Sequence, residues 1–127
     1  MSFAAPPIER LKKRAAFLAA AKGASAMRGA VMVQAVDRGD GREAIGVGFT
    51  ATRRIGGAVV RNRAKRRLRE AARRLVPLHG RPGHDYVLIA RAGTAKRPWP
   101  RLLDDLESAL ISLAANPVPA SPAAADR

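Results

Sequence analysis

The sequence predicts an α+β fold, a two-layer sandwich in which helices pack on one small sheet of about four strands. Long amphipathic segments alternate with short apolar runs that glycines interrupt, which predicts the element order α-β-β-β-α-β-α. A chain of 127 residues can bury one modest core. We therefore expect a single domain at residues 8–115, between a flexible arm (1–7) and a disordered, Pro- and Ala-rich tail (116–127).

The first helix is expected from about Ile8 to Lys22, with Gly23 as its stop signal. Phe17 projects about 100° or more from the apolar face of this helix, among Lys13 and Arg14. An aromatic ring among cations suits the stacking of single-stranded bases, but it can equally widen the apolar face. That face consists of Leu11, Ala15 and Leu18.

The next two segments are expected to be strands. Ala30–Asp37 is rich in valine, and the Gly-containing run 38–42 is a turn signal before a second strand from about Ala44 to Arg53. We expect these two strands to form a hairpin. Gly46 and Gly48 in the second strand suggest a bulge or the close approach of another backbone. A third short strand can lie at residues 55–60.

A basic helix is predicted from Arg61 to Val76, and Pro77 ends it. At about 100° per residue, its apolar side chains fall on one arc of roughly 140°. This arc contains Ala64, Leu68, Ala71, Ala72, Leu75 and Val76. Lys and Arg fill nearly all of the remaining surface, where Glu70 is the only acid. A solvated face would mix charges of both signs, so this uncompensated repulsion indicates that the helix binds an anion.

Beyond this helix, His79 and His84 are expected in a Gly/Pro loop, and the nearly all-apolar run Asp85–Arg91 is expected to be a buried strand. A last helix is predicted from about Pro98 to Ala114, with a proline in its first turn. Its apolar stripe consists of Leu102, Leu103, Leu106, Leu110 and Leu113. Its acidic residues are expected on a solvated face that points away from a bound polyanion: Asp104, Asp105 and Glu107.

Composition limits the possible classes of function. The net charge of +14 and the isoelectric point of about 11.8 indicate a polyanionic partner, with nucleic acid favoured over a membrane surface. No apolar run approaches the ~20 residues that span a bilayer, and no secretory signal is expected. The absence of Cys fits a cytoplasmic location. Because no nucleophile–base set, P-loop or metal-ligand cluster is present, we expect neither catalytic residues nor a metal held by the protein alone.

One long segment carries a more specific signal. Residues 48–72 contain Arg61-Asn62-Arg63, followed by Lys65-Arg66 and Arg69. This pattern closely resembles the signature of the bacterial ribonuclease P protein component, whose core is an Arg-Asn-Arg motif. Residues 10–17 resemble the first helix of that family and residues 87–93 resemble its last strand, so the similarity spans roughly residues 8–114.

The resemblance implies a small subunit bound to a large catalytic RNA. Together they would cleave precursor tRNA and release its 5′ leader, and the RNA would carry out the hydrolysis with Mg²⁺ that it binds itself. The expected partners are ribonuclease P RNA and precursor tRNA, with neither membrane nor DNA. The resemblance also implies a left-handed βαβ crossover over the basic helix, against the usual right-handed rule.

The same resemblance assigns the site residues. The catalytic RNA is expected against the motif residues Arg61, Asn62, Arg63, Lys65, Arg66 and Arg69. The single-stranded leader is expected in a cleft between the first helix and the sheet, with Phe17, Lys13, Arg14, Arg53 and Arg54. Gly57 stands where the family commonly has Asn. Fewer bases are expected to stack in the cleft, because three residues stand near positions where relatives often place aromatic side chains: Ala21, Val31 and Gln34.

Three other interpretations share some of these features. A structural ribosomal-RNA-binding protein would have the same size and charge, and only the long motif argues against it. A helix-turn-helix DNA-binding protein needs a helix just before the basic one, where residues 55–60 are Gly-rich and β-branched. A protein-only nuclease would need carboxylates that this chain does not group together.

Overall fold

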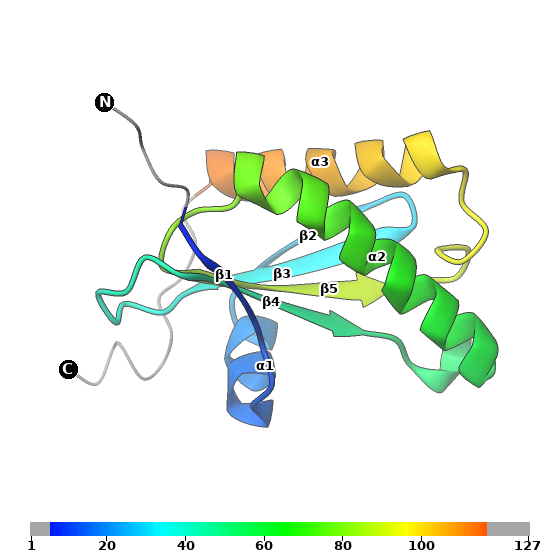
Figure 1. Ribbon diagram of the computed structural model, residues 1–127, viewed down its shortest axis with the longest axis horizontal. Coiled ribbons are helices and arrows are strands. Elements are labelled where there is room, and N and C mark those ends of the chain that lie inside the picture. Colours follow the sequence, from blue (N-terminus) through cyan, green and yellow to red (C-terminus); the bar gives the residue numbers. More distant parts are fainter. Residues whose placement is uncertain (1–5, 117–127) are drawn as a thin grey trace.

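The computed structural model describes residues 6–116, which form one mixed sheet with helices on both faces (Figure 1). The strands are β1 (Ile8–Arg10), β2 (Ala24–Arg28), β3 (Val31–Asp37), β4 (Ile45–Thr50) and β5 (His84–Ala90). The helices are α1 (Arg14–Ala21), α2 (Ala58–His79) and α3 (Trp99–Ala115), with a 3₁₀ turn, η1 (Arg53–Ile55), before α2. α2 and α3 cover one face and α1 the other. The α+β prediction is confirmed, with five strands rather than about four. The predicted arm and tail lie mostly outside the described residues.

β5 occupies the middle of the sheet, whose strand order is β1-β4-β5-β3-β2. It runs parallel to β4 and antiparallel to β3. Tyr86, Val87 and Leu88 are all buried, because helices cover the sheet on both sides. The predicted hairpin between the strands at 30–37 and 44–53 is therefore wrong. β5, which is apolar on both faces, lies between β3 and β4 and pairs with both.

The β4–α2–β5 unit is a parallel crossover of the uncommon hand. In Figure 1, α2 lies above the sheet, β4 and β5 both run from left to right, and β5 lies behind β4. Seen from the side of α2 with the strands pointing upward, the chain moves to the left from β4 to β5. The crossover is therefore left-handed, as the resemblance implied, whereas nearly all such connections are right-handed.

The N-terminal segment differs from the helix predicted at residues 8–22. Ile8–Arg10 extend as β1, which pairs in parallel with β4. The pairing continues through the Leu11 N–H, which donates to the Val47 carbonyl at 2.9 Å. α1 therefore begins only at Arg14. These residues pair with the free edge of β4 because it provides hydrogen-bond partners for their backbone groups. That pairing is more favourable than a helix for a segment whose helical pattern is weak.

The later start also changes which face α1 buries. Ala20 is fully buried and Phe17 is half-buried, whereas Ala15 and Leu18, predicted on the apolar face, are exposed. Phe17 joins a small apolar cluster that α1 forms with β3 and β5. The ring therefore widens the apolar contact of α1 while part of it remains accessible.

Other boundaries differ for local reasons. Ala24–Arg28 form β2, whose small residues carry little strand signal, and β2 pairs with β3 through a turn at Gly29. The strand predicted at 55–60 is wrong, because Gly57 is the N-cap of α2 and the next residues already form its first turn. α2 also continues past Pro77 and ends at His79, since a proline in the last turn disturbs few helical hydrogen bonds.

The amphipathic patterns of the two long helices are confirmed. The buried residues of α2 are the predicted arc, and four predicted leucines of α3 are buried with Leu103 partly buried beside them. Both helices pack on the side chains that alternate strand residues direct to this face of the sheet, including Val33, Tyr86 and Leu88. Each fully buried large apolar side chain contributes roughly 1.5–3 kcal/mol. This packing holds α2 on the sheet with its charged surface outward.

The acidic residues of α3 do not all face solvent. Asp104 is exposed as predicted, but Asp105 is only 9% exposed. The Asp105 carboxylate pairs with Arg97 at 2.9 Å and accepts the N–H of Ala30 at 3.0 Å. The prediction is wrong for this residue, because a carboxylate with a cation and an N–H donor can be buried without a large penalty. Asp105 thereby joins α3 to the turn between β2 and β3.

Glycines of β4 make room for the segment that packs on the α1 side of the sheet. A Cβ at Gly48 would lie 2.7 Å from the ring atoms Cε1 and Cζ of Phe17. A Cβ at Gly46 would lie 2.6 Å from Cδ2 of Leu11. These glycines therefore allow side chains to lie on the strand, where the sequence suggested a bulge or another backbone.

Gly48→Ala should destabilise the protein by about 1–3 kcal/mol, because the added methyl group overlaps the Phe17 ring. Gly57→Ala is the control, since its φ is −73° and a Cβ there meets no heavy atom within 4 Å. The control should change stability by about 1 kcal/mol or less, through the weaker N-cap alone. Urea denaturation measures both values, and equal values would contradict the close packing of Phe17 on β4.

Candidate nucleic-acid interface

Most of the polar and charged side chains of α2 project from two flanks of the helix. With the apolar face on the sheet, a step of about 100° per residue places one group toward β4 and β1: Asn62, Lys65, Arg66, Arg69 and Arg73. The other group projects toward α3: Arg63, Arg67 and Arg74. Most of the predicted motif residues thus share the first flank, and Arg63 lies on the second.

The first flank borders a groove of about 720 Å³ between α2 and the edge formed by β1 and β4, here called the β1–α2 groove. Its apolar lining consists of Ile8, Val47, Phe49 and Ala72. Its cations are Arg10, Arg66, Arg69 and Arg73. The guanidinium carbon of Arg69 lies 5.9 Å from the centroid of the Phe49 ring, within the range of a cation–π contact. Phe49 and Arg10 were not among the predicted site residues. The packing of α2 on the sheet brings Phe49 of β4 to the groove, and the pairing of β1 with β4 brings Arg10 there.

Arginines on the second flank contact the protein itself. Arg67 donates hydrogen bonds to the carbonyls of Thr94, at 2.6 Å, and Arg97. The guanidinium carbons of Arg67 and Arg74 lie 5.9 and 5.6 Å from the centroid of the Trp99 ring. Burial, with repulsion from Arg63, lowers the pKa of Arg67 from its usual value. Arg67 is therefore a structural cation that fixes the loop before α3.

Arg61 differs from the other motif residues. It projects from the same side of α2 as the buried face, near the helix N-terminus, and it is half-buried. Its Nε atom is buried and has no hydrogen-bond partner within residues 6–116. Asn62 and Arg63 beside it are exposed. A buried donor without a partner costs about 1–3 kcal/mol, so Arg61 is the motif side chain whose hydrogen bonding the protein leaves incomplete.

The residues predicted to bind the leader lie on two separate elements. Lys13 precedes α1 and Arg14 begins it, and both are exposed one turn before Phe17. Arg53 and Arg54 form η1, which packs against α2 just before the Arg-Asn-Arg motif. The structure thus brings Lys13, Arg14 and Phe17 together beside the sheet. It places the two arginines of η1 next to the motif on α2 instead.

The face of the sheet beside α1 is the place of the predicted leader cleft. Gln34 lies on this face and presents an amide rather than an aromatic ring. Val31 is directed to the opposite face and is fully buried, and Ala21 is exposed at the end of α1. Other half-buried residues of this face are Met32, Thr50 and Ile89.

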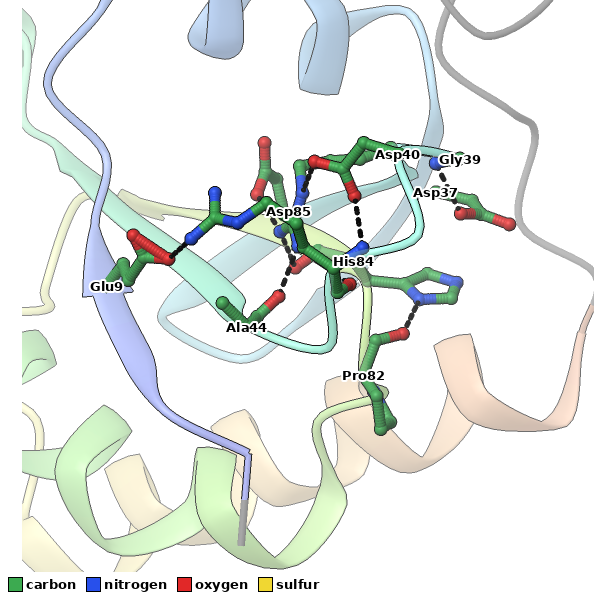
Figure 2. Close-up of polar contacts among 10 residues, drawn as sticks. Glu9, Asp37, Gly39, Asp40, Ala44, Pro82, His84 and Asp85 are labelled. Atoms are coloured by element: carbon green, nitrogen blue, oxygen red, sulfur yellow. Dashed lines mark hydrogen bonds and ion pairs between the residues drawn. The ribbon is translucent and has the colours of Figure 1, made fainter.

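A second groove, of about 420 Å³, lies between the α1 segment and the β1–β4 edge, and Lys13 and Arg38 line it. Figure 2 shows the polar contacts that hold this region together. Arg38 pairs with Asp85 at 2.8 Å and with Asp40 at 2.9 Å, and it also donates to the Ala44 carbonyl. Burial acts to lower the pKa of Arg38, but the hydrogen bonds to the two carboxylates outweigh it and raise that pKa. Nothing in the turn sequence distinguished this residue.

The two histidines were predicted in a loop, but His79 ends α2 and His84 begins β5. His79 Nε2 lies 3.2 Å from Glu107 Oε2, and His84 Nδ1 lies 2.9 Å from the Pro82 carbonyl oxygen. Within residues 6–116, no group of three or more His, Asp and Glu residues is placed to hold a metal ion. None of the helices in the described part of the chain combines the length and apolar character of a membrane span.

Comparison with known proteins agrees with this fold and motif. The family model described as Ribonuclease P matches residues 6–114. The chain belongs to the bacterial ribonuclease P protein component family. It is 64% identical over 108 residues to the ribonuclease P protein component of Caulobacter vibrioides, covering 85% of this chain and 72% of the relative. Identity to the same component of Ruegeria pomeroyi is 56%, covering 84% of this chain and 86% of the relative.

Solved structures of ribonuclease P proteins have the same fold. The Staphylococcus aureus protein matches with a TM-score of 0.68 and 27% identity, covering 84% of this chain and 97% of that one. The Thermotoga maritima protein matches with a TM-score of 0.69 and 25% identity, covering 83% of this chain and 97% of that one. The predicted family is confirmed, and it gives the chain a role in ribonuclease P, a tRNA-processing ribonucleoprotein.

Arg67→Ala should lower the free energy of unfolding by about 1–3 kcal/mol, because two carbonyls lose a charged donor. Arg66→Ala is the matched control, since Arg66 is an exposed neighbour on the same helix. It should change stability by less than about 0.5 kcal/mol. Thermal and urea unfolding compare the two variants, and a larger loss for Arg66→Ala would contradict the structural role of Arg67.

Proposed function

We propose that this protein binds the catalytic RNA of ribonuclease P along α2 and the 5′ leader of precursor tRNA beside α1, and so promotes endonucleolytic removal of the leader. The observation that carries the proposal is the exposed cationic flank of α2 in a member of this family. The one acid of the helix, Glu70, is already paired with Arg73 at 2.7 Å and with Arg74 at 3.5 Å. Arg73 lowers the pKa of Glu70, so the carboxylate stays charged and engaged with the protein.

Arginine suits this task because its planar guanidinium group donates two parallel hydrogen bonds to a phosphate. Arg63, Arg66 and Arg69 are exposed and lie on one helix, so they can follow an RNA backbone without entering a groove. Arg61 would gain an acceptor for a buried donor when a phosphate binds nearby. Arg53 and Arg54 of η1 extend the same cationic surface beyond the start of α2.

The leader would lie against the other face of the sheet. Lys13 and Arg14 can neutralise phosphates while the accessible part of the Phe17 ring stacks on a base. Mature tRNA lacks the leader, so these contacts favour the precursor. Contacts on the α1 side of the sheet would therefore favour precursor over mature tRNA, and contacts along α2 would hold the protein on the catalytic RNA.

The chemistry belongs to the RNA in this proposal. Mg²⁺ held mainly by the catalytic RNA would activate the water that cleaves the phosphodiester bond. The protein contributes fixed cations between two polyanions that otherwise repel each other. Screening of that repulsion tightens substrate binding and lowers the Mg²⁺ concentration that cleavage requires.

Cleavage of a precursor tRNA at low Mg²⁺ by a bacterial ribonuclease P RNA, with and without this protein, tests the proposal. We expect strong stimulation that is largely lost in the double variant Arg61→Ala/Arg63→Ala, with circular dichroism to verify folding. Arg66→Ala/Arg69→Ala, at two exposed positions, should show the same loss without a folding defect. Lack of stimulation by a folded protein that binds ribosomal RNA tightly would overturn the proposal and favour a structural ribosomal protein.

Phe17→Leu should weaken binding of precursor tRNA by about 1–3 kcal/mol, because leucine keeps an apolar contact with β4 but offers no aromatic face to a base. Binding of mature tRNA should change little, since it has no leader. Filter binding of both RNAs to the reconstituted complex gives the comparison. An equal loss for the two RNAs would contradict a stacking role for Phe17.

A further inference from the structure

The β1–α2 groove is lined differently from a surface that only neutralises phosphates. Its volume of about 720 Å³ is within the range of small-ligand pockets. Three elements supply apolar side chains to it: Ile8 from β1, Val47 and Phe49 from β4, and Ala72 from α2. Phe49 packs partly against the core and is half-buried, so some of its ring is accessible in the groove.

The charge of the groove is positive despite two acids in its lining. Glu9 pairs with Arg42, and Glu70 pairs with Arg73 and Arg74, so both carboxylates are engaged. Within residues 6–116, no carboxylate forms an ion pair with the remaining cations of the lining, which are Arg10, Arg66 and Arg69. The groove thus combines an apolar interior with unneutralised guanidinium groups.

We propose that this groove binds one unpaired nucleotide of the RNA subunit, with its base against Phe49 and Arg69 and its phosphates at Arg10 and Arg66. The inference rests on the proposed function, because it requires the first flank of α2 to contact RNA. The motif alone predicts a surface that contacts only the RNA backbone. The groove adds to that surface a site for a base.

A nucleobase is the group that fits both properties of the groove. Stacking of a base on an aromatic side chain contributes about 1–3 kcal/mol, and a guanidinium plane such as that of Arg69 can stack on a base as well. Every base has such a face, so the site tolerates different bases. Bases inside an A-form helix are inaccessible to side chains from the deep, narrow major groove, so the occupant must be unstacked in a loop, bulge or junction.

Chemical probing of a bacterial ribonuclease P RNA at saturating protein concentration tests the proposal. The base is probed with dimethyl sulfate and the ribose by 2′-hydroxyl acylation, with wild type, Phe49→Leu and Arg69→Lys. We expect wild type to protect at least one unpaired base that becomes reactive again with either variant. Protection of the surrounding riboses should persist, because both variants keep the motif cations or their charge.

Arg74→Lys is the matched control. Arg74 also holds its guanidinium carbon over an aromatic ring, at 5.6 Å from the Trp99 centroid, but it does not line the β1–α2 groove. The same exchange therefore removes a planar cation outside the proposed site, and it should leave the base protected. Arg69 is exposed, so Arg69→Lys tests the site even if Phe49→Leu disturbs folding, which thermal unfolding will show.

The outcomes separate the two proposals. If the folded wild type does not protect this RNA at any concentration, the proposed function itself is wrong. If it protects the backbone but no unpaired base depends on Phe49 and Arg69, the base-binding site is wrong and the proposed function stands. Loss of base protection in Arg74→Lys equal to that in Arg69→Lys would also overturn the base-binding site.

Discussion

The contact between the apolar face of α2 and the sheet is the interaction on which the rest of the structure depends. It consists largely of alanine and leucine, so the helix can approach the strands closely with Ala64, Leu68 and Ala71 fully buried. Burial along this face must outweigh the repulsion among the cations on the remaining surface, which one paired acid relieves only locally. A bound polyanion would remove that repulsion, so folding and RNA binding are expected to stabilise each other.

The two long helices, α2 and α3, could be predicted from the sequence because their signal is local. The buried arc of α2 and the leucine stripe of α3 follow from spacing alone. The sheet could not be predicted in the same way, because strand order is decided by residues far apart in the chain. β1 is a strand only because β4 offers it an edge, and β3 and β4 are separated because β5 is apolar on both faces.

The candidate site shows the same limit at the level of single side chains. In the sequence, the arginines of α2 look alike, yet they have three different environments in the fold. Arg67 donates to backbone carbonyls, Arg61 keeps a buried donor without a partner in the described part of the chain, and Arg69 borders a groove. Of the motif residues, Asn62, Arg63, Arg66 and Arg69 are exposed, whereas Arg61 and Lys65 are half-buried. Only the packing of neighbouring loops and strands distinguishes structural cations from available ones.

The central position of β5 has a consequence for the order in which the protein can form. β5 is the last strand in the chain, and both β4 and β3 need it as a neighbour. During synthesis the basic helix therefore leaves the ribosome before the strand that completes its packing surface exists. Until Ala90 has emerged, α2 is a charged amphipathic segment without its full core, in a chain whose pairing is mostly non-local. A nascent segment with this charge attracts polyanions before it is folded. Under the proposed function, RNA would therefore accompany its folding as well as its assembly.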